Sequence, residues 1–264
     1  MIAALVAAAA LVAPVPSFRH VVVVVFENHE RSEIVGNPAA PTFASLARRG
    51  ATLTSYDAVA HPSLPNYLAL VSGSTQGITD DCTDCLVSGP SLADTLAAAG
   101  RTWKTYAEGL PRPGFTGASA GDYAKKHDPF VYFRHVLAHP SWLANVVPLL
   151  RRFGRLPDFA LVVPNLCNDM HDCSVATGDA WLARNVVPLL STDATVFVVF
   201  DEGTSDVGGG GNVEALVVGR GVRPGAVSNQ PTSHYGLLRT IEQAWGLPFL
   251  GRSARGRPIT GIWH

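Results

Sequence analysis

The stretch His20-Val21-Val22-Val23-Val24-Val25-Phe26 contains five consecutive valines. Such a β-branched run is typical of a strand that is buried on both faces, as in a parallel sheet covered by helices. The run stops at Glu27-Asn28, so an acid and an amide follow directly after the strand. We therefore expect an α/β fold with polar groups at the carboxyl end of a central strand.

Further apolar runs alternate with helical patterns along the chain. Strands are expected at 52–59, 102–106, 159–163, 195–200 and 214–218, and helices at 41–49, 91–99, 179–190 and 233–245. This alternation favours a mostly parallel central sheet with helices on both sides, a three-layer α/β/α sandwich. The pattern weakens from 108 to about 156, which we expect to be an insertion packed over the sheet. Residues 17–264 are thus predicted to form a single domain.

The composition is that of a globular protein. The 264 residues carry a net charge of −1, with 47% hydrophobic and 16% charged residues, and can bury a substantial core. A nucleic-acid partner usually requires a basic excess, so none is expected. An anionic substrate would have to be bound by local groups and a metal.

Residues 1–13 form an Ala/Val/Leu run that is followed by Pro14-Val15-Pro16. The run resembles the apolar core of a signal peptide, although no Lys or Arg precedes it and no clear cleavage site follows. It is too short for a transmembrane helix. We expect residues 1–16 to be a signal peptide or leader, the alternative being a disordered leader, and the protein to be secreted or held in the cell envelope.

Four cysteines form two close pairs in the sequence, Cys82/Cys85 and Cys167/Cys173. A zinc site would need more ligands than either pair supplies. An even number of cysteines in polar loops of an exported chain favours two local disulfides, each tightening one loop. The alternative, a thiol oxidoreductase built on Cys82-x-x-Cys85, leaves the acidic strand ends unexplained.

The segment His61-Pro62-Ser63-Leu64-Pro65-Asn66-Tyr67 is expected to deliver a hydroxyl to the start of a helix that Gly73 ends. Pro65 suits the first turn of that helix. At such a junction Ser63 would meet unpaired backbone N–H groups and the positive end of the helix dipole, where phosphate binds. The alternative is that Ser63 only caps the helix.

Three apolar strands each end in an acidic or amide cluster: Glu27-Asn28, residues 165–172, and Asp201-Glu202. The carboxyl ends of strands in an open α/β sheet line one crevice, so these clusters are expected to converge. Their oxygens suit one divalent cation, with calcium, magnesium or manganese competing well against zinc.

The chemistry that fits this set is phosphoryl transfer through a covalent intermediate. A metal held by Glu27, Asn28, Asp201 and Glu202 would lower the pKa of a coordinated Ser63 hydroxyl. A histidine would protonate the leaving alkoxide and later activate water. The candidate histidines, each in a polar loop or at a helix start, are His127, His171 and His234.

Taken in order, these motifs resemble a known family. They are Glu27-Asn28, His61-Pro62-Ser63-x-Pro65-Asn66-Tyr67, Asn168-Asp169-Met170-His171-Asp172, Asp201-Glu202 and Ser233-His234-Tyr235. The family is that of the bacterial and fungal acid phosphatases and phospholipases C, and the chain is most similar to its secreted mycobacterial phosphatases, which include phosphatidylinositol 3-phosphatases. The resemblance spans 20–263 and implies an alkaline-phosphatase-like fold.

The resemblance also implies roles for individual residues. Ser63-Leu64-Pro65-Asn66 is similar to the Thr-Phe-Pro-Asn nucleophile segment of nucleotide pyrophosphatases, which favours Ser63 over Ser72 or Ser74 as the nucleophile. Histidines are implied to replace a second metal site, with Lys126-His127 near the phosphate, where some relatives carry a His-His pair. The residues expected to contact the substrate are His61, Asn66, Lys126 and Asp169.

The expected function is therefore that of an exported, metal-dependent acid phosphatase. It would hydrolyse phosphate monoesters, phosphoinositides among them, through a phosphoserine. One alternative is a phosphodiesterase of the phospholipase C type, since one site can serve both chemistries. Another is a non-catalytic cell-surface binding module that keeps the fold. Membrane contact is expected to be peripheral at most, because the chain shows no tandem membrane-binding domain.

Overall fold

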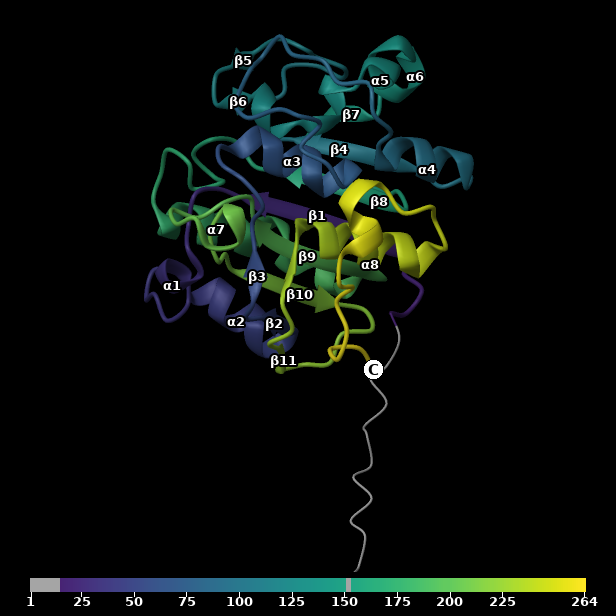
Figure 1. Cartoon of the computed structure of the whole chain (residues 1–264). Helices are drawn as coiled ribbons and strands as arrows, with labels where there is room; N and C mark the ends of the chain where they lie inside the picture. The colour runs from purple at the N-terminus through teal and green to yellow at the C-terminus, as the bar shows by residue number, and fades with distance from the viewer. Residues whose placement is uncertain (1–14, 151–152) are drawn as a thin grey trace, which may run out of the picture.

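The computed structural model describes residues 15–150 and 153–264, so the predicted leader lies almost wholly outside it. An eight-stranded sheet forms the centre, in the order β11-β2-β10-β9-β1-β8-β4-β7 (Figure 1). Its strands are β1 (His20–Phe26), β2 (Ala51–Leu53), β4 (Trp103–Ala107), β7 (Val146–Pro148), β8 (Phe159–Val163), β9 (Ala194–Phe200), β10 (Ala215–Gly219) and β11 (Ala226–Ser228).

The pairing of these strands confirms the predicted fold class. Within the described ranges, the neighbours in this sheet are parallel except where β10 meets β9 and β2. The valine run is the central strand β1, and Val21 to Phe26 are buried by the layers on either side. The mostly parallel α/β prediction made from this run is therefore confirmed.

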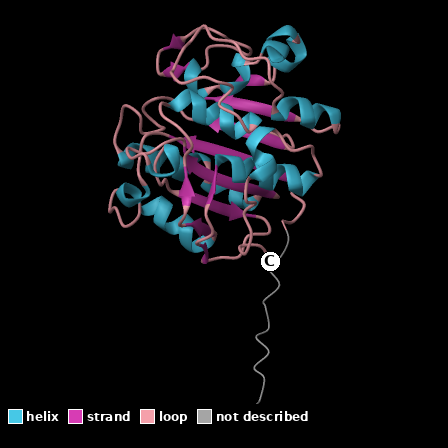
Figure 2. Cartoon of the chain, viewed as in Figure 1, coloured by secondary structure: helices cyan, strands magenta, loops and turns pink. Residues whose placement is uncertain are grey.

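Helices cover both faces of the sheet (Figures 1 and 2). On one face α3 packs against α8 and α4, and on the other α2 packs against α7. Successive strand residues point to opposite faces, so the ring of Phe26 packs against α2 and α7 while the next side chain, Glu27, meets α3. The helices of these layers are α2 (Pro41–Arg49), α3 (Ser63–Ser72), α4 (Leu92–Ala98), α7 (Val175–Asn185) and α8 (His234–Trp245).

Three predicted segments differ from the structure. The helix expected at 179–190 begins earlier and ends at Asn185, and the short 3-10 helix η3 (Val187–Ser191) follows it. The strand expected at 52–59 is divided into β2 and β3 (Tyr56–Asp57), and β3 pairs with β12 (Thr232–Ser233) in a separate small sheet. The segment expected to pack over the sheet also extends it, because β7 lies parallel to β4 at one edge. Its other elements are β5 (Ser119–Ala120), β6 (Tyr123–Ala124), η1 (Lys125–His127), η2 (Pro129–Tyr132), α5 (Arg134–Ala138) and α6 (Pro140–Leu143).

The register of the central strands places the chain segments that follow them side by side. Phe26 of β1 pairs with Phe200 of β9, and the backbone N–H of Asp201 donates to the carbonyl of Phe26 at 2.8 Å. The loop after β8 lies beside the end of β1 as well, because the N–H of Glu27 donates to the carbonyl of Asp169 at 2.9 Å. The three polar clusters therefore meet at one end of the sheet, as expected.

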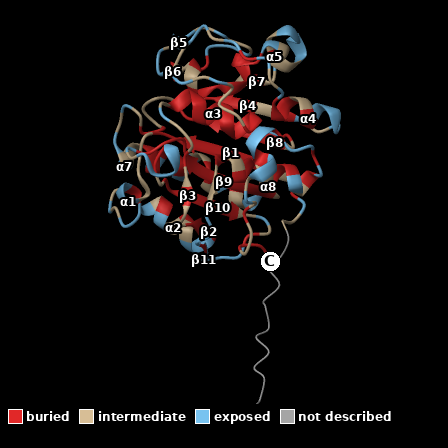
Figure 3. Ribbon diagram, in the orientation of Figure 1, coloured by how far each residue is buried: buried red, intermediate tan, exposed pale blue. Residues whose placement is uncertain are grey.

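Aromatic side chains of α2 and α7 pack against this end of the sheet. The ring of Phe26 lies 5.4 Å from that of Phe43 and 5.9 Å from that of Trp181, both in edge-on contact. Phe200 completes the cluster, and Figure 3 shows that buried residues continue through the whole sheet. Edge-on aromatic contacts add to the burial of apolar area and fix the ends of β1 and β9.

The remaining short elements lie at the periphery of the sandwich. They are α1 (Arg31–Ile34), η3 (Val187–Ser191), η4 (Val207–Gly209) and η5 (Gly251–Arg255). In the part of the chain that the structure describes, no helix is long and apolar enough to cross a lipid bilayer.

A buried glutamate fastens η5 to α8. Glu242 accepts hydrogen bonds from the hydroxyl of Ser253 at 2.5 Å and from the backbone N–H of Leu250 at 2.8 Å. Burial raises the pKa of Glu242 to about 7, against the opposing effect of these hydrogen bonds. The folded protein thus keeps a proton on Glu242 at a pH where the unfolded chain has released it.

This linkage predicts a pH-dependent contribution to stability. Between about pH 5 and pH 7 the folded state binds the extra proton, so Glu242 lowers the unfolding free energy by up to about 1.4 kcal/mol per pH unit as the pH rises. Urea unfolding of Glu242→Gln should show a shallower fall over this range than wild type. The exposed Asp122→Asn serves as control, and equal slopes for Glu242→Gln and wild type would contradict the prediction.

Candidate active site

Ser63 is the first residue of α3, and its hydroxyl is directed at two carboxylates. Its Oγ donates to Glu27 Oε2 at 3.0 Å and lies 3.2 Å from Glu202 Oε1. The residue at the N-cap is Pro62, so the serine hydroxyl does not serve as the helix cap. Ser63 is buried, and its hydroxyl proton can be accepted by the carboxylate of Glu27 or by that of Glu202.

Tyr67 lies one helical turn after Ser63 and supports the same carboxylate. Its hydroxyl donates to Glu27 Oε1 at 2.6 Å, and its ring stacks on that of His127 with a centroid separation of 5.2 Å. The sequence analysis gave this tyrosine no role of its own. Its spacing of four residues from Ser63 is the signal that places both side chains on one face of the helix.

The carboxylates of Glu27, Asp201 and Glu202 are buried close together at the ends of β1 and β9. Burial, followed by the charges of Asp201 and Asp169, raises the pKa of Glu27 well above its usual value. Burial and then the charge of Glu202 do the same to the pKa of Asp201. The backbone N–H of Asn28 binds Asp201 Oδ1 at 3.2 Å, whereas Asp201 Oδ2 is buried without a hydrogen-bond partner.

This donor set fits a divalent cation. Like-charged carboxylates in a dry site repel one another, and a cation removes that repulsion while it satisfies the free Asp201 oxygen. Asn28 adopts the left-handed backbone conformation, with φ 60°, which an asparagine tolerates. Four of the five predicted ligands, Glu27, Ser63, Asp201 and Glu202, contribute side-chain oxygens to this cluster, and Asn28 contacts it through its backbone.

A second group of possible ligands shares Glu27. One ligand atom from each of Glu27, His127 and His171 lies within 4.8 Å of the other two. These histidines were predicted to transfer protons, and the structure adds imidazole ligation of a metal as a second possible role. The structure therefore contains a possible metal-binding site with both oxygen and nitrogen donors.

His127 is buried between two acids. Its Nε2 lies 3.3 Å from Glu27 Oε1, and its Nδ1 lies 3.3 Å from Asp169 Oδ2. Burial, followed by the charges of Lys126 and His171, lowers the pKa of His127 well below its usual value. A neutral imidazole has one nitrogen free to accept a proton or bind a cation.

Lys126 connects His171 to the start of α3 through Asp81. Its Nζ donates to Asp81 Oδ2 at 2.9 Å and to His171 Nε2 at 3.1 Å, because an ammonium group can only donate. His171 Nδ1 in turn contacts Asp172 at 2.6 Å. Asp81 Oδ1 accepts from the backbone N–H of Leu64 at 2.9 Å.

Asp81 was missed by the sequence analysis. It lies in a polar loop next to Cys82. The only sequence feature that could have marked Asp81 as a site residue is its position beside a predicted disulfide. Burial alone would lower the pKa of Lys126, but the hydrogen bond and charge of Asp81 outweigh it and raise the pKa. Lys126 is thus held as a cation near Ser63.

His234 was predicted to be a catalytic acid, but both of its ring nitrogens are engaged. Nε2 donates to the backbone carbonyl of Asp201 at 2.6 Å, and Nδ1 accepts from the hydroxyl of Tyr56 at 2.9 Å. Burial lowers the pKa of His234 to about 4, so the ring is neutral above that pH. In this geometry His234 fixes the end of β9 and has no nitrogen free for the substrate.

Two of the residues predicted to contact substrate, Asn66 and His61, have side chains that are also engaged. The Asn66 side chain accepts from the N–H groups of Val59 and Ala60 and donates to the carbonyls of Ala60 and Pro62, so its amide holds the loop before α3. His61 contacts Glu202 through Nδ1, and its Nε2 donates to the carbonyl of Ser205 at 3.1 Å. Burial opposes it, but these contacts raise the pKa of His61.

Comparisons with known proteins identify the family of this chain. The model of the phosphoesterase family matches residues 36–248. The chain belongs to the phosphoesterase family. It is 41% identical over 255 residues to a phosphatidylinositol-3-phosphatase of Mycobacterium tuberculosis, covering 94% of this chain and 84% of that protein. It is 32% identical to a probable acid phosphatase of Kluyveromyces lactis, covering 89% of this chain and 60% of that protein.

Solved structures support the alkaline-phosphatase-like fold. An alkaline phosphatase superfamily protein from Vibrio parahaemolyticus has a TM-score of 0.62 at 14% identity, covering 92% of this chain and 72% of that one. Murine ectonucleotide pyrophosphatase/phosphodiesterase 5 has a TM-score of 0.57 at 12% identity, covering 88% of this chain and 96% of that one. The resemblance found in the motifs is confirmed, and this phosphoesterase is a phosphoric ester hydrolase.

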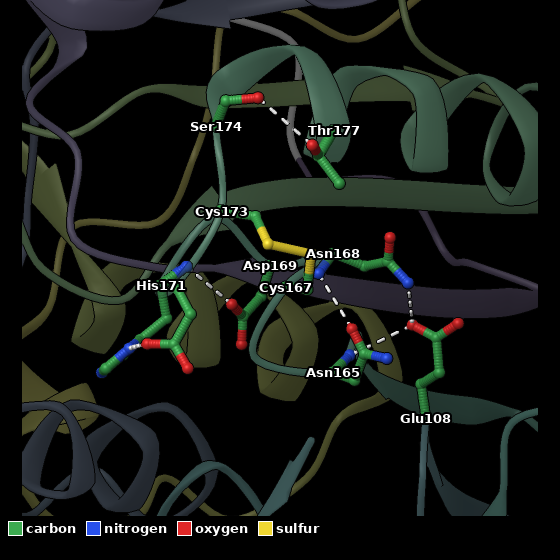
Figure 4. Close-up of a disulfide and its surroundings, with 10 residues drawn as sticks. Glu108, Asn165, Cys167, Asn168, Asp169, His171, Cys173, Ser174 and Thr177 are labelled. Carbon is green, nitrogen blue, oxygen red and sulfur yellow. Dashed lines mark hydrogen bonds and ion pairs between the residues drawn. A yellow bond between two sulfur atoms is a disulfide. The ribbon is translucent and has the colours of Figure 1, made fainter. Parts of the chain in front are cut away.

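Both predicted disulfides are present in the phosphoesterase, Cys82–Cys85 and Cys167–Cys173. The second closes the loop that carries Asp169 and His171 (Figure 4). Within that loop Asp169 Oδ1 accepts from the N–H of His171 at 2.8 Å, and burial raises the pKa of Asp169 to about 7. Outside the loop Glu108 binds the side chain of Asn168 at 3.0 Å.

The loop geometry predicts that Cys167–Cys173 matters more for activity than for stability. A bridge over so few residues constrains the unfolded chain by only about 2 kcal/mol. The double variant Cys167→Ser, Cys173→Ser should keep its fold but lose at least about tenfold in kcat/KM, because His171 and Asp169 are no longer fixed. Phosphate-release kinetics and urea unfolding test this, with Cys82→Ser, Cys85→Ser as the matched pair. Free thiols at 167 and 173 in the purified protein would contradict the account.

Proposed function

We propose that this phosphoesterase hydrolyses phosphate monoesters in two steps, through a phosphoserine formed on Ser63. The observation that supports this most directly is the position of the Ser63 hydroxyl, at the first turn of α3 and within 3.2 Å of two carboxylates. A nucleophile hydrogen-bonded to a base is the arrangement that covalent catalysis requires.

In the first step Ser63 Oγ bonds to phosphorus as the bond to the leaving alcohol oxygen breaks. The hydroxyl proton passes to Glu202, whose other carboxylate oxygen contacts His61. Lys126 lies beside the start of α3 as the cation for the phosphate oxygens. The expected backbone N–H groups are not free for this, because the N–H of Leu64 donates to Asp81 and Pro65 has none.

His171 is the candidate for proton transfer to the leaving oxygen. Asp172 orients its ring through Nδ1, and about a quarter of the side chain, 27%, is exposed, so the ring can reach a substrate. Lys126 Nζ lies 3.1 Å from Nε2, so a proton passes from the ammonium to Nε2 and from Nε2 to the leaving oxygen, and Lys126 is a neutral amine until the second step. In the second step His171 takes a proton from water as the water oxygen bonds to phosphorus, which is general base catalysis, and passes it back to Lys126. Glu202 returns its proton to Ser63 Oγ as the bond from Oγ to phosphorus breaks.

The oxygen cluster at Ser63 supports metal dependence. A divalent cation bound by Glu27, Ser63, Asp201 and Glu202 would lower the pKa of the serine hydroxyl and withdraw charge from the phosphate oxygens. The backbone N–H of Asn28 donates a hydrogen bond to Asp201 Oδ1, and the hydroxyl of Tyr67 donates one to Glu27 Oε1. These supporting hydrogen bonds orient the carboxylates.

The relatives and the disulfides support the proposed substrate class and location. The mycobacterial relative is named a phosphatidylinositol-3-phosphatase, which makes phosphoinositides the first substrates to test. Two disulfides are typical of proteins in oxidising compartments, and they support export to the cell envelope or medium.

The nucleophile assignment predicts a loss of turnover without a loss of fold. Ser63→Ala removes one oxygen and should change the unfolding free energy by no more than about 1 kcal/mol, while kcat for p-nitrophenyl phosphate falls by at least about a hundredfold. Ser72→Ala makes the same chemical change at the other end of α3 and should keep activity. If Ser63→Ala retains more than roughly a tenth of wild-type kcat, a serine nucleophile is excluded.

The metal assignment makes a separate prediction. Asp201→Asn keeps an acceptor for the Asn28 N–H but removes one negative charge, so activity should require at least about tenfold more Mg²⁺, Ca²⁺ or Mn²⁺. Asp206→Asn, an exposed change a few residues on, should leave the requirement unaltered. Calorimetric metal titration checks the affinity independently of turnover. Full activity in exhaustively chelated wild type would contradict metal dependence.

A further inference from the structure

A basic groove lies outside the carboxylate site, between β12, the start of α8 and η5. It has a volume of about 450 Å³ and is lined by Thr232, Ser233, Tyr235, Arg252, Arg255 and Arg257 among others. The three arginines are exposed. The ion pairs of arginine in the described chain involve other positions, namely Arg19, Arg31, Arg101 and Arg220.

The charge of this region differs from that of the whole protein. The segment 231–264 carries four arginines and one glutamate, a net charge of +3, whereas the full chain has a net charge of −1. The one glutamate, Glu242, is buried beneath η5 and faces Ser253, so it does not neutralise the groove at the surface. Anionic groups are therefore attracted to this part of the molecule selectively.

The groove is held in shape by the packing around it. Glu242 binds both Leu250 and Ser253, and the N–H of Arg252 donates to the carbonyl of Gly73 at 2.7 Å. The guanidinium of Arg252 lies 5.7 Å from the ring centre of Tyr235, whose hydroxyl is buried without a hydrogen-bond partner. A preorganised cationic groove suits a phosphate group.

An exposed aromatic residue lies on the same segment. Phe249 is 44% exposed, and the guanidinium of Arg239 lies 3.4 Å above its ring centre. Arg239 also donates to the carbonyl of Ala254, between two groove arginines, at 3.2 Å. A basic side chain on an exposed aromatic ring, with further arginines on the same segment, is a combination that suits anionic membrane surfaces.

The groove is connected to the catalytic region through His234. Ser233 and Tyr235 line the groove, and the residue between them binds the carbonyl of Asp201. In addition β12 pairs with β3, which leads into the loop before Ser63. A lipid surface at the groove would therefore lie beside the elements that position the nucleophile.

We propose that the groove and Phe249 dock the protein on a membrane that contains anionic phospholipids. Arg252, Arg255 and Arg257 would bind lipid phosphates, and the ring of Phe249 would enter the headgroup region. This deepens the proposed function, because it supposes a phosphate substrate within the membrane. The docking itself requires no turnover and is measured separately.

The test uses vesicles of phosphatidylcholine with or without one fifth phosphatidylserine. Wild type should sediment with the anionic vesicles and not with the neutral ones, and binding should weaken at high salt. The triple variant Arg252→Ser, Arg255→Ser, Arg257→Ser should bind anionic vesicles about tenfold to a hundredfold more weakly, as the loss of three surface cations implies. Phe249→Ser should weaken binding separately.

A matched control removes the same charge elsewhere. Arg48→Ser, Arg49→Ser, Arg155→Ser takes three exposed arginines from outside the groove and should leave vesicle binding within about twofold of wild type. All variants should keep wild-type kcat/KM on soluble p-nitrophenyl phosphate, which also shows that they fold. Equal loss of binding in both triple variants, or no loss in the groove variant, would overturn the proposal. So would inorganic phosphate binding at the groove in a protein that ignores anionic vesicles.

Discussion

The repulsion among buried carboxylates around one serine hydroxyl is the constraint on which the site depends. Glu27 and Asp201 have pKa values raised by burial and by neighbouring acids, and Glu202 faces the same hydroxyl. Such a cluster destabilises the fold unless protons, hydrogen bonds or a cation compensate. The sheet register, the tyrosine at the second turn of α3 and the backbone N–H of Asn28 all act on these carboxylates.

The histidines divide into those that support this cluster and those that can act on a substrate. His234 fixes the end of β9 through the carbonyl of Asp201. His61 contacts Glu202 Oε2, the carboxylate oxygen that does not face Ser63. His171 is partly exposed and is paired with Lys126, in a loop closed by a disulfide. His171 is therefore the partly exposed imidazole that can exchange a proton with Lys126.

Much of this could be predicted from the sequence because it follows from local patterns. The valine run gives a central strand, and the residue after it must lie at the sheet end, which located Glu27 and Asp201. Side-chain contacts between distant segments leave no such pattern. The hydroxyl of Tyr56 on His234 and the bond from Asp81 to Lys126 join residues 178 and 45 positions apart, and so could not be found.

The central claim is that phosphate is transferred first to Ser63 and then to water. Each in-line displacement inverts the configuration at phosphorus, so two steps restore it. The test is phosphoryl transfer from a monoester made chiral at phosphorus with oxygen isotopes to an acceptor alcohol, which takes the place of water in the second step. The account predicts a product phosphate ester with retained configuration. Inversion would mean a single displacement, with the attacking group activated at the carboxylate cluster and Ser63 as a bystander.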